Sequence, residues 1–336
     1  MPTIIETFNL TKRFPRYSGY LQLFERRTDN VLTAVDGVNL QIHEAEVLAL
    51  LGSNGAGKTT LSKILCTLVL PTDGRALICG RDVVREASAV RKLVGMVDGQ
   101  ERSFYWRLSA RQNLEFFAAL HNLSGQAAQT RIDELLALVG LTEHADRRFM
   151  SFSTGMRQRL AIARGLLVMP RVLFMDEVTR SLDPKTARDL RAFVRKRLVE
   201  QLGCTVIWVT HRLEEAEEIC DRVAIMKRGQ VLDCASVAEL QRHLPARQVY
   251  RLKVGGLPPD ASAALRNLPG VLDLECNGHD SSSADFKVTI SDEEQVLPQV
   301  IDLLVRQGAK IQHCSSQAAS LEEAFLYLTD GERRGL

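Results

Sequence analysis

The chain has 336 residues, a formal net charge of +2 and 45% hydrophobic residues, which predicts about two domains of ordinary globular composition. So small a net charge gives no bulk electrostatic reason to expect nucleic acid or an anionic membrane as a partner. The 7 cysteines are scattered with no C-x-x-C pair, which indicates buried reduced thiols rather than a disulfide framework or a zinc site. No uncharged apolar run reaches about 18 residues and the start shows no signal-peptide pattern, so we expect another chain to cross any membrane that this one serves.

Apolar runs of strand length fill the first 100 residues, and turn signals such as residues 71–74 separate them. Residues 14–30 are aromatic and basic, and we interpret them as an inserted surface loop. A helix is expected from about Lys58 to residue 68, where the apolar residues follow helical spacing. The expected strands are 3–10, 38–42, 46–51, 76–80 and 93–97.

From about residue 100 to 165 the pattern becomes helical, and after it strands and helices alternate again. Short buried strands are expected at 171–175 and 205–209, and a hairpin at 223–232. This order predicts an α/β core with parallel strands, which a helical subdomain interrupts. The expected helices are 113–120, 132–139, 156–169, 186–202 and 213–220.

Pro245 marks the expected boundary between a first domain of residues 1–244 and a second domain of residues 245–336. The second domain is expected to run in the order β-α-β-β-α-β, which is typical of a small ferredoxin-like α+β domain. Its residues point to no chemistry, and we interpret it as a module for packing or for dimer support. The expected elements are strands 249–254, 271–275, 285–290 and 310–313 and helices 261–268, 294–307 and 321–328.

Residues 52–60 read GSNGAGKTT and fit the phosphate-loop pattern G-x-x-x-x-G-K-[ST] in full, between an expected strand and an expected helix. The glycines let the backbone wrap around an anion, and the N–H groups and the helix N-terminus then attract phosphate. Lys58 is expected to reach the β- and γ-phosphates, and Thr59 to bind Mg²⁺. The expected nucleotide contacts here are Gly52, Ser53, Asn54, Gly55, Ala56, Gly57, Lys58, Thr59 and Thr60.

A second chemical pair, Asp176 and Glu177, ends the apolar strand 171–175 in the form of a Walker B segment. Ligands of parallel sheets bind at the carboxyl ends of strands, and adjacent strand residues point opposite ways, so the two acids can have different roles. We expect Asp176 to hold Mg²⁺ and Glu177 to orient and deprotonate the attacking water. Two acids after an apolar run are weak evidence for a Walker B segment by themselves, but they are strong evidence in a chain that also has a phosphate loop.

Three further motifs accompany the phosphate loop and the Walker B segment. Residues 153–158, STGMRQ, resemble the signature motif of the ABC transporter ATPases, with Thr154 and Met156 where that family more often has Gly and Gln. Residues 181–184, SLDP, resemble its D-loop, and His211 after a buried strand resembles its switch histidine. With the phosphate loop and the Walker B segment, these motifs follow one another in family order. The resemblance implies the P-loop NTPase fold of the ABC type.

The Q-loop glutamine of the family has two candidate positions in this chain. Gln100 fits when the count runs back from Asn113, whereas Gly99 fits when it runs forward from the strand 93–97. We take Gln100, which the resemblance then assigns to catalysis and to Mg²⁺ binding. Phe14 matches the family's position for stacking on adenine, with Tyr17 or Tyr20 as alternatives in the following loop.

The mechanism that the resemblance implies needs two nucleotide domains, paired head to tail, with each ATP between one phosphate loop and the partner's signature motif. Ser153 and Gly155 would donate to the γ-phosphate in trans, and His211 would contact it from its own loop. The implied catalytic residues are Glu177, His211, Gln100 and Asp183, and the implied Mg²⁺ ligands are Thr59, Asp176 and Gln100.

The chain is similar to ATPase subunits of bacterial exporters for drugs, lipids or polysaccharides, whose permease is a separate polypeptide. That similarity implies a place at the cytoplasmic face of the cell membrane, held by the permease, and a second nucleotide domain from an identical or a sister subunit. The expected helix 321–328 looks like the closing helix of that branch. Residues 102–107, RSFYWR, could form a groove for a permease helix or pack inside the helical subdomain.

Two rival classes fit less well. A soluble ABC ATPase that acts on ribosomes or DNA would carry two nucleotide domains, long coiled coils or zinc cysteines, and the composition shows no basic face. An importer subunit would carry a longer barrel-type regulatory domain than the one expected here. We therefore expect an ATP-hydrolysing export subunit with no nucleic-acid partner, whose cargo the sequence does not identify.

Overall fold

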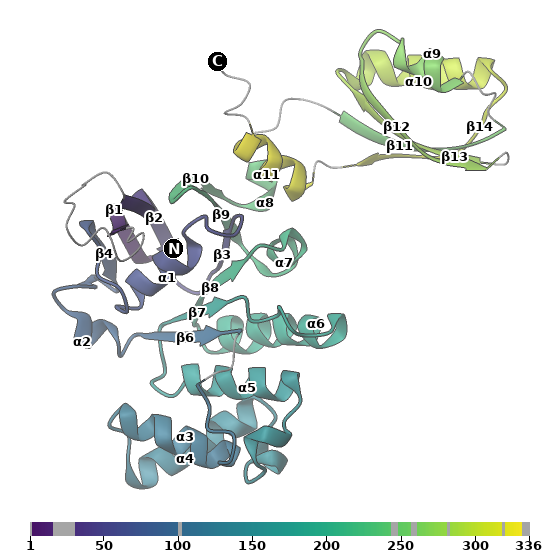
Figure 1. Ribbon diagram of the computed structural model, residues 1–336. Coiled ribbons are helices and arrows are strands. Elements are labelled where there is room, and N and C mark those ends of the chain that lie inside the picture. Colours follow the sequence, from purple (N-terminus) through teal and green to yellow (C-terminus); the bar gives the residue numbers. More distant parts are fainter. Residues whose placement is uncertain are drawn as a thin grey trace, which may run out of the picture. The chain divides into compact units, whose positions relative to one another are not determined.

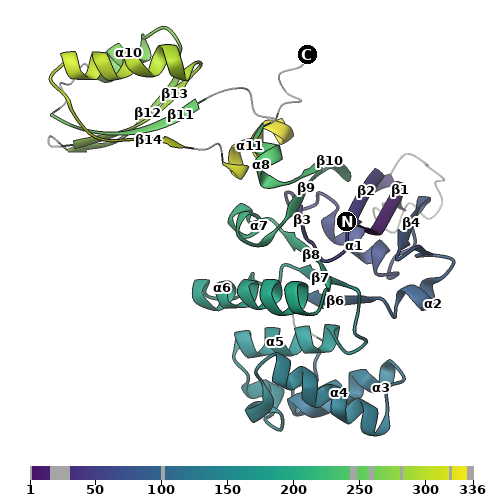
Figure 2. The same ribbon diagram turned by 180° about the vertical axis from the view of Figure 1, so that it is seen from behind.

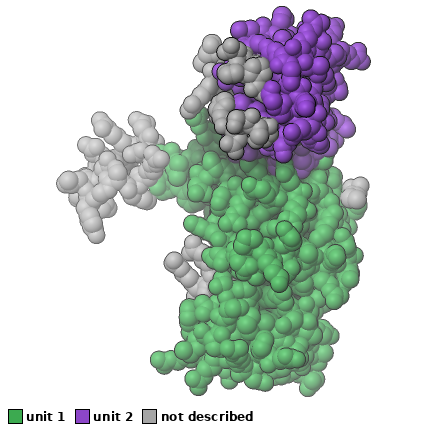
Figure 3. All heavy atoms as spheres, turned by 90° about the vertical axis from the view of Figure 1, so that its right-hand side faces the viewer, with its two compact units in different colours: residues 1–236 green, residues 237–336 purple. Residues whose placement is uncertain are grey.

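A computed structural model of the chain describes residues 2–15, 31–99, 103–242, 248–256, 261–280, 283–317 and 320–330. Two compact units make up the chain, residues 1–236 and 237–336, and Figure 3 colours them separately. This division lies earlier in the chain than the expected boundary at 244/245, since α8 (Val237–Arg242) packs against α11 (Leu321–Asp330) within the second unit. In the parts of the chain that the structure describes, no helix is long and apolar enough to cross a membrane.

A six-stranded sheet in the order β10-β9-β3-β8-β7-β6 forms the centre of the first unit (Figure 1). Neighbouring strands from β9 to β6 run parallel, and only the edge strand β10 is antiparallel. Every residue of β3, β7 and β8 is buried, as expected for a parallel sheet that is covered on both faces. The predicted parallel α/β core is therefore confirmed. The strands are β3 (Val47–Leu51), β6 (Val94–Asp98), β7 (Val172–Asp176), β8 (Thr205–Thr210), β9 (Arg222–Lys227) and β10 (Gln230–Ala235).

A second, antiparallel sheet lies beside the first in the order β2-β1-β4-β5. Its two long strands exceed the expected lengths because they pair with each other as far as Pro15 and Val31. Their outer ends consist of exposed and half-buried residues, so these ends lack the buried apolar pattern that marks a strand in the sequence. Residues of both sheets and of α1 share one apolar core. The elements are β1 (Thr3–Pro15), β2 (Val31–His43), α1 (Lys58–Leu65), β4 (Asp73–Ile78), β5 (Arg81–Asp82) and α2 (Ala87–Val90).

The predicted helical subdomain is a group of three helices, and both ribbon views show them stacked together (Figures 1 and 2). They are α3 (Ala110–Leu120), α4 (Gly125–Leu138) and α5 (Thr154–Gly165), and α5 packs on β6. Helix α3 begins at a capping box, in which Ser109 and Gln112 each accept the other's backbone N–H. Beyond β7, the expected helix 186–202 is divided into α6 (Pro184–Phe193) and a π-helical segment (Val194–Gln201), and α7 (Leu213–Ile219) follows β8.

The second unit contains a four-stranded antiparallel sheet in the order β12-β13-β11-β14. Between α8 and α11, its elements follow one another as β-α-β-β-α-β, and Figures 1 and 2 show α9 and α10 over one face of the sheet. An apolar core of its own, including Leu252, Phe286 and Val300, joins the sheet to α10. The elements are β11 (Gln248–Gly255), α9 (Ala261–Arg266), β12 (Val271–Asp280), β13 (Ser283–Ile290), α10 (Glu293–Arg306) and β14 (Lys310–Gln317).

Asp221, at the start of β9, ties three segments of the first unit together. Its carboxylate accepts a bond of 2.8 Å from the Val47 N–H and two bonds of 2.6 and 2.7 Å from the Arg195 guanidinium. Burial raises the pKa of Asp221, but these hydrogen bonds outweigh burial and hold the pKa below its usual value. A group with a lowered folded-state pKa stabilises the fold above its unfolded pKa, and this contribution is lost as the pH falls through the folded pKa.

We predict that Asp221→Asn lowers the urea midpoint of unfolding at pH 7, with a difference from the parent that shrinks below about pH 4, near the unfolded pKa of aspartate. The measurement is urea unfolding of both proteins from pH 7 to pH 3. Asp189→Asn is the control, because Asp189 is an exposed carboxylate on α6. An Asp221→Asn effect of equal size at every pH would contradict the role of the ion pair.

Candidate functional site

The phosphate loop lies between the buried strand β3 and helix α1, as predicted. Gly55 and Gly57 have positive φ angles of 83° and 104°, which L side chains rarely adopt. At Gly57 a Cβ atom would also lie 2.2 Å from the Ala34 carbonyl oxygen, so only glycine fits. Ser53 and Asn54 are exposed at the tip, Ala56 is buried and Thr60 is half-buried on α1. The loop is therefore held in a shape that side chains at its glycines would disturb.

Lys58 is buried at the start of α1, with 6% of its surface exposed, and its ammonium folds back onto the loop. Its Nζ donates to the carbonyl oxygens of Gly52 and Ser53 at 2.7 and 3.0 Å. Burial lowers the pKa of Lys58, while the negative charges of Glu177 and Asp176 act in the opposite direction. The ammonium thus has only neutral hydrogen-bond partners in the loop, and carboxylates lie near it.

Acidic and hydroxyl groups gather where β6 and β7 end. Thr59 Oγ1 donates to Asp176 at 2.9 Å, and burial raises the pKa of Asp176 against the effect of that bond. A cavity of about 300 Å³ is lined by Thr59, Asp98, Gly99, Asp176, Glu177 and Arg180. Mg²⁺ prefers oxygen ligands, and proteins usually hold it with one or two side chains together with phosphates of the substrate. Thr59 and Asp176 suit such a partly protein-made site, and among the described residues no cluster of three acidic, His or Cys residues forms a complete cage.

Glu177 follows β7 with a positive φ angle of 50°, a sparsely populated conformation for a residue with a side chain. Its backbone N–H donates to the Val209 carbonyl at 2.9 Å. Gly99 makes room on the other side, since a Cβ there would lie 2.2 Å from the Glu177 carbonyl oxygen. Strained backbone that its surroundings hold in place is a feature of functional sites.

The Glu177 carboxylate lies between two nitrogen groups. His211 Nδ1 lies 2.9 Å from Oε1, and Arg180 Nη1 donates to Oε2 at 3.1 Å. The structure therefore brings together Glu177 and His211, which were predicted separately. It adds Arg180, which the sequence analysis did not select. The only signal in the sequence is a cation three residues after the acid.

The signature residues lie in a different place. Ser153 caps the N-terminus of α5, with its Oγ 3.3 Å from the Met156 N–H, and Asp183 caps α6 by accepting from the Thr186 N–H at 3.0 Å. The hydrogen bonds from Thr186 lower the pKa of Asp183. The two helix starts meet closely, since a Cβ on Gly155 would lie 2.9 Å from the Thr186 methyl group.

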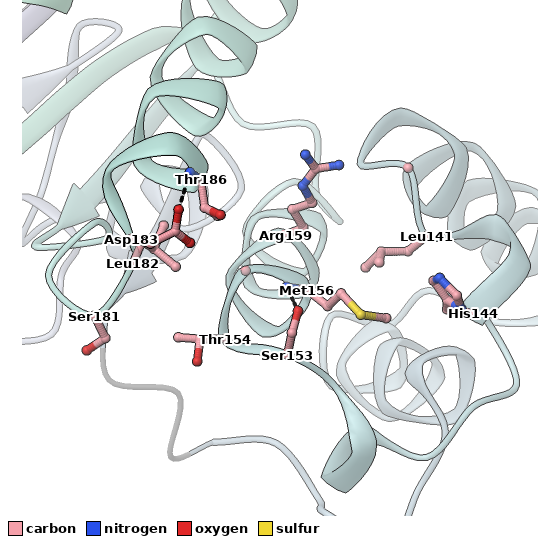
Figure 4. A pocket seen from close by; sticks show the side chains of 12 residues that line it. Leu141, His144, Ser153, Thr154, Met156, Arg159, Ser181, Leu182, Asp183 and Thr186 are labelled. Carbon is pink, nitrogen blue, oxygen red and sulfur yellow. Dashed lines mark hydrogen bonds between the residues drawn. The ribbon is translucent and has the colours of Figure 1, made fainter.

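A cavity of about 600 Å³ opens beside these two caps. Figure 4 shows the start of α5, with Ser153 and Thr154, between Ser181 and Asp183 on one side and His144 on the other. None of the residues that line this cavity lines the cavity beside Glu177. One copy of the chain therefore keeps the signature residues and the phosphate loop in separate sites.

The structure does not test the roles predicted for two residues, Phe14 and Gln100. Phe14 lies near the end of β1, half-buried, with Lys12 Nζ 4.9 Å from the centre of its ring. Gln100 lies outside the described residues, as do the alternative stacking residues Tyr17 and Tyr20. The roles of Phe14 and Gln100 stay predictions.

The family model described as ABC transporter matches residues 35–180. The daunorubicin resistance ATP-binding protein DrrA3 of Streptomyces coeruleorubidus is 35% identical to this chain, over 90% of the chain and 92% of that protein. The linearmycin resistance ATP-binding protein LnrL of Bacillus subtilis is 30% identical over 88% of the chain and 94% of that protein. Each match covers more residues than the first unit contains, so both similarities extend into the second unit.

Solved structures agree on the fold. CbiO1 of Clostridium perfringens, part of the ABC transporter complex CbiONQ, matches with a TM-score of 0.60 and 26% identity over 73% of this chain and 97% of its own. The ATP-binding cassette MJ0796, in a dimeric post-hydrolysis state with ADP and Pi, matches with a TM-score of 0.58 and 27% identity over 69% and 98%. A soluble ATPase of ribosomes or DNA is not favoured by these relatives. The chain belongs to the ABC transporter ATP-binding proteins, and it is an ATP-hydrolysing subunit of such a transporter.

Proposed function

We propose that this chain drives export of a substrate through a separate permease, from the cytoplasmic face of the cell membrane, with ATP and Mg²⁺ at the phosphate loop. The observation that carries the catalytic part is the Glu177 carboxylate, held between His211 and Arg180 beside the Thr59–Asp176 pair. The export direction is supported by relatives of nearly full length that are named for resistance to daunorubicin and linearmycin.

Phosphate binding begins with the phosphate loop and Lys58. The Lys58 ammonium would exchange the neutral carbonyl oxygens of Gly52 and Ser53 for anionic phosphate oxygens, and charge-assisted hydrogen bonds are the stronger kind. Thr59 and Asp176 would hold Mg²⁺ together with Gln100, and the ion would neutralise phosphate charge. Phe14 would stack on adenine. The exposed hydroxyl of Ser53 and amide of Asn54 lie at the loop tip, where the nucleotide would enter.

Hydrolysis then depends on Glu177 as the general base. A carboxylate oxygen has two lone pairs, so Glu177 can keep its bond to His211 and still accept the proton of an attacking water. His211 would hold the carboxylate and contact the γ-phosphate. Asp183, in the D-loop, would act on the nucleotide that the other subunit binds.

Completion of the site would require a second nucleotide domain. Ser153 and Gly155, at the N-terminus of α5, line a cavity separate from the phosphate loop of the same copy. Backbone N–H groups at a helix N-terminus bind phosphate well, so this end of α5 would meet the γ-phosphate bound by an identical or a sister subunit. The second unit of the chain would support this pairing.

The permease would dock on the aromatic segment at the start of the helical subdomain. Phe104 is 3% exposed and packs between Phe117 and Phe149, whereas Tyr105 and Trp106 are 49% and 51% exposed. The packing of Phe104 supports the interpretation that the segment packs inside the helical subdomain, and the exposure of Tyr105 and Trp106 supports the proposed groove for a permease helix. Exposed aromatic side chains are frequent at protein interfaces, and these two would receive a helix of the permease.

We predict that Lys58→Ala weakens ATP binding by roughly 10- to 100-fold, because a charged hydrogen bond contributes about 1.5–3 kcal/mol, and that it abolishes turnover. The measurements are equilibrium nucleotide binding and steady-state phosphate release. Lys63→Ala is the control, because Lys63 is an exposed lysine on the same helix. Parent-like hydrolysis by Lys58→Ala would remove Lys58 from the site.

We predict that Glu177→Gln keeps ATP binding but slows hydrolysis by about 10²–10⁴-fold, since glutamine keeps the shape and cannot accept the proton. With ATP and Mg²⁺, the unhydrolysed γ-phosphate should hold two nucleotide domains together, which size-exclusion chromatography detects. Glu143→Gln, an exposed acid elsewhere in the first unit, is the control. Near-normal phosphate release would exclude Glu177 as the base, whereas lost hydrolysis without dimers would indicate that a sister subunit or the permease is needed for pairing.

A further inference from the structure

Glu215 is a buried carboxylate that hydrogen-bonds to the segments next to Glu177 and His211. Glu215, in the first turn of α7, is 4% exposed. Its Oε1 accepts from Thr179 Oγ1 at 2.6 Å, and its Oε2 accepts from Thr210 Oγ1 at 3.0 Å and from Trp208 Nε1 at 3.2 Å. The Arg212 guanidinium lies 3.4 Å from Oε1. Each carboxylate oxygen therefore has at least two donors near it.

These donors and a further cation come from separate segments of the chain. Thr179 belongs to the segment after β7, and Trp208 and Thr210 belong to β8. Arg191 of α6, itself largely buried, lies 3.9 Å from Glu215 Oε1. A buried charge is costly unless it is paired and hydrogen-bonded. A fully satisfied buried network of this kind fixes one arrangement of the segments that it joins.

The segments that Glu215 joins are those that hold Glu177. Thr179 directly precedes Arg180, and Thr210 directly precedes His211. Arg180 and His211 contact the two oxygens of the Glu177 carboxylate, one on each. The Thr179–Glu215–Thr210 bridge therefore joins the residues that directly precede these two contacts.

We propose that Glu215 is a positioning residue for ATP hydrolysis, which holds the loops of Arg180 and His211 at the separation that orients Glu177. The inference rests on the proposed role of Glu177 as the base. Glu215 acts through Thr179 and Thr210, because its carboxylate is buried and bonded to their hydroxyl groups. Misplacement of a catalytic group by about 1 Å can cost 10²-fold in rate, so loss of the bridge should lower the rate of hydrolysis and leave the phosphate loop intact.

The test uses Glu215→Gln and Thr179→Val in the full chain. Glutamine keeps one acceptor oxygen and the side-chain volume, whereas valine removes only the hydroxyl that reaches Glu215. Glu214→Gln is the matched control, since it makes the same change at an exposed residue in the same turn of α7. The measurements are ATP affinity, single-turnover hydrolysis per bound nucleotide, and the midpoint of thermal unfolding.

We expect Glu215→Gln to slow hydrolysis about 10- to 100-fold, Thr179→Val to slow it in the same direction, and both to bind ATP within about twofold of the parent. Counting hydrolysis per bound nucleotide removes any unfolded fraction from the comparison. Parent-like rates in both variants would overturn the inference, as would a rate loss in Glu214→Gln equal to that in Glu215→Gln.

A second comparison separates this inference from the function on which it rests. If Glu215 acts through Glu177, adding Glu215→Gln to Glu177→Gln should cause little further loss of the slow residual hydrolysis, because the base is already absent. An undiminished further loss would show that Glu215 acts elsewhere and would overturn the proposal. Normal hydrolysis by Glu177→Gln alone would instead overturn the role of Glu177 as the base. Slow hydrolysis by Glu177→Gln together with normal hydrolysis by Glu215→Gln would refute only the positioning role of Glu215.

Discussion

Parallel pairing of β3, β8, β7 and β6 is the constraint on which the nucleotide site depends. The register places Asp98 beside Asp176, Asp176 beside Val209, and Leu51 beside Thr210. These strands therefore end at one edge of the sheet, and the residues that follow their ends meet there. A slip of one residue in any of them would turn its side chains to the other face and displace the functional residue at its end.

The charged side chains at this edge of the sheet suit charged ligands, namely phosphate and Mg²⁺. Asp176 and Glu177 lie close to the buried Lys58 ammonium. Burial raises the pKa of Asp176 and lowers the pKa of Lys58, and both changes favour the neutral form of the side chain. Phosphate would give Lys58 an anionic partner, and Mg²⁺ would give Asp176 a cationic one. Both ions would thus relieve a desolvation cost that the protein alone carries.

The fold keeps the contacts that orient Glu177 apart from the signature residues, which would bind a partner's nucleotide. Glu177 is oriented within one copy by a strained backbone, by His211 and Arg180, and behind them by the buried Glu215. Ser153 and Gly155 instead face a cavity at the surface of the first unit. Such a division would let the base stay in place while binding of a second domain controls when the γ-phosphate receives its last contacts.

Strand and helix patterns in the sequence predict most elements of the first unit, because apolar periodicity is a local property that burial imposes directly. The predictions fail where this signal is weak. The outer ends of β1 and β2 were missed because only pairing between distant residues extends those strands. Helix α4 begins at Gly125 rather than at 132, since its first turns are mostly exposed and polar.

By itself, the sequence determined which chemical groups the chain carries and in what order, since the phosphate loop, Asp176-Glu177, Ser153–Gly155, Asp183 and His211 are all recognisable in it. Tertiary structure alone decided which of them touch. The contact of His211 with Glu177 and the bridge through Glu215 join segments whose separation depends on strand register and on packing of α7. Local sequence patterns do not contain that information, because a buried hydrogen bond is specified by two distant residues and by everything that holds them in place.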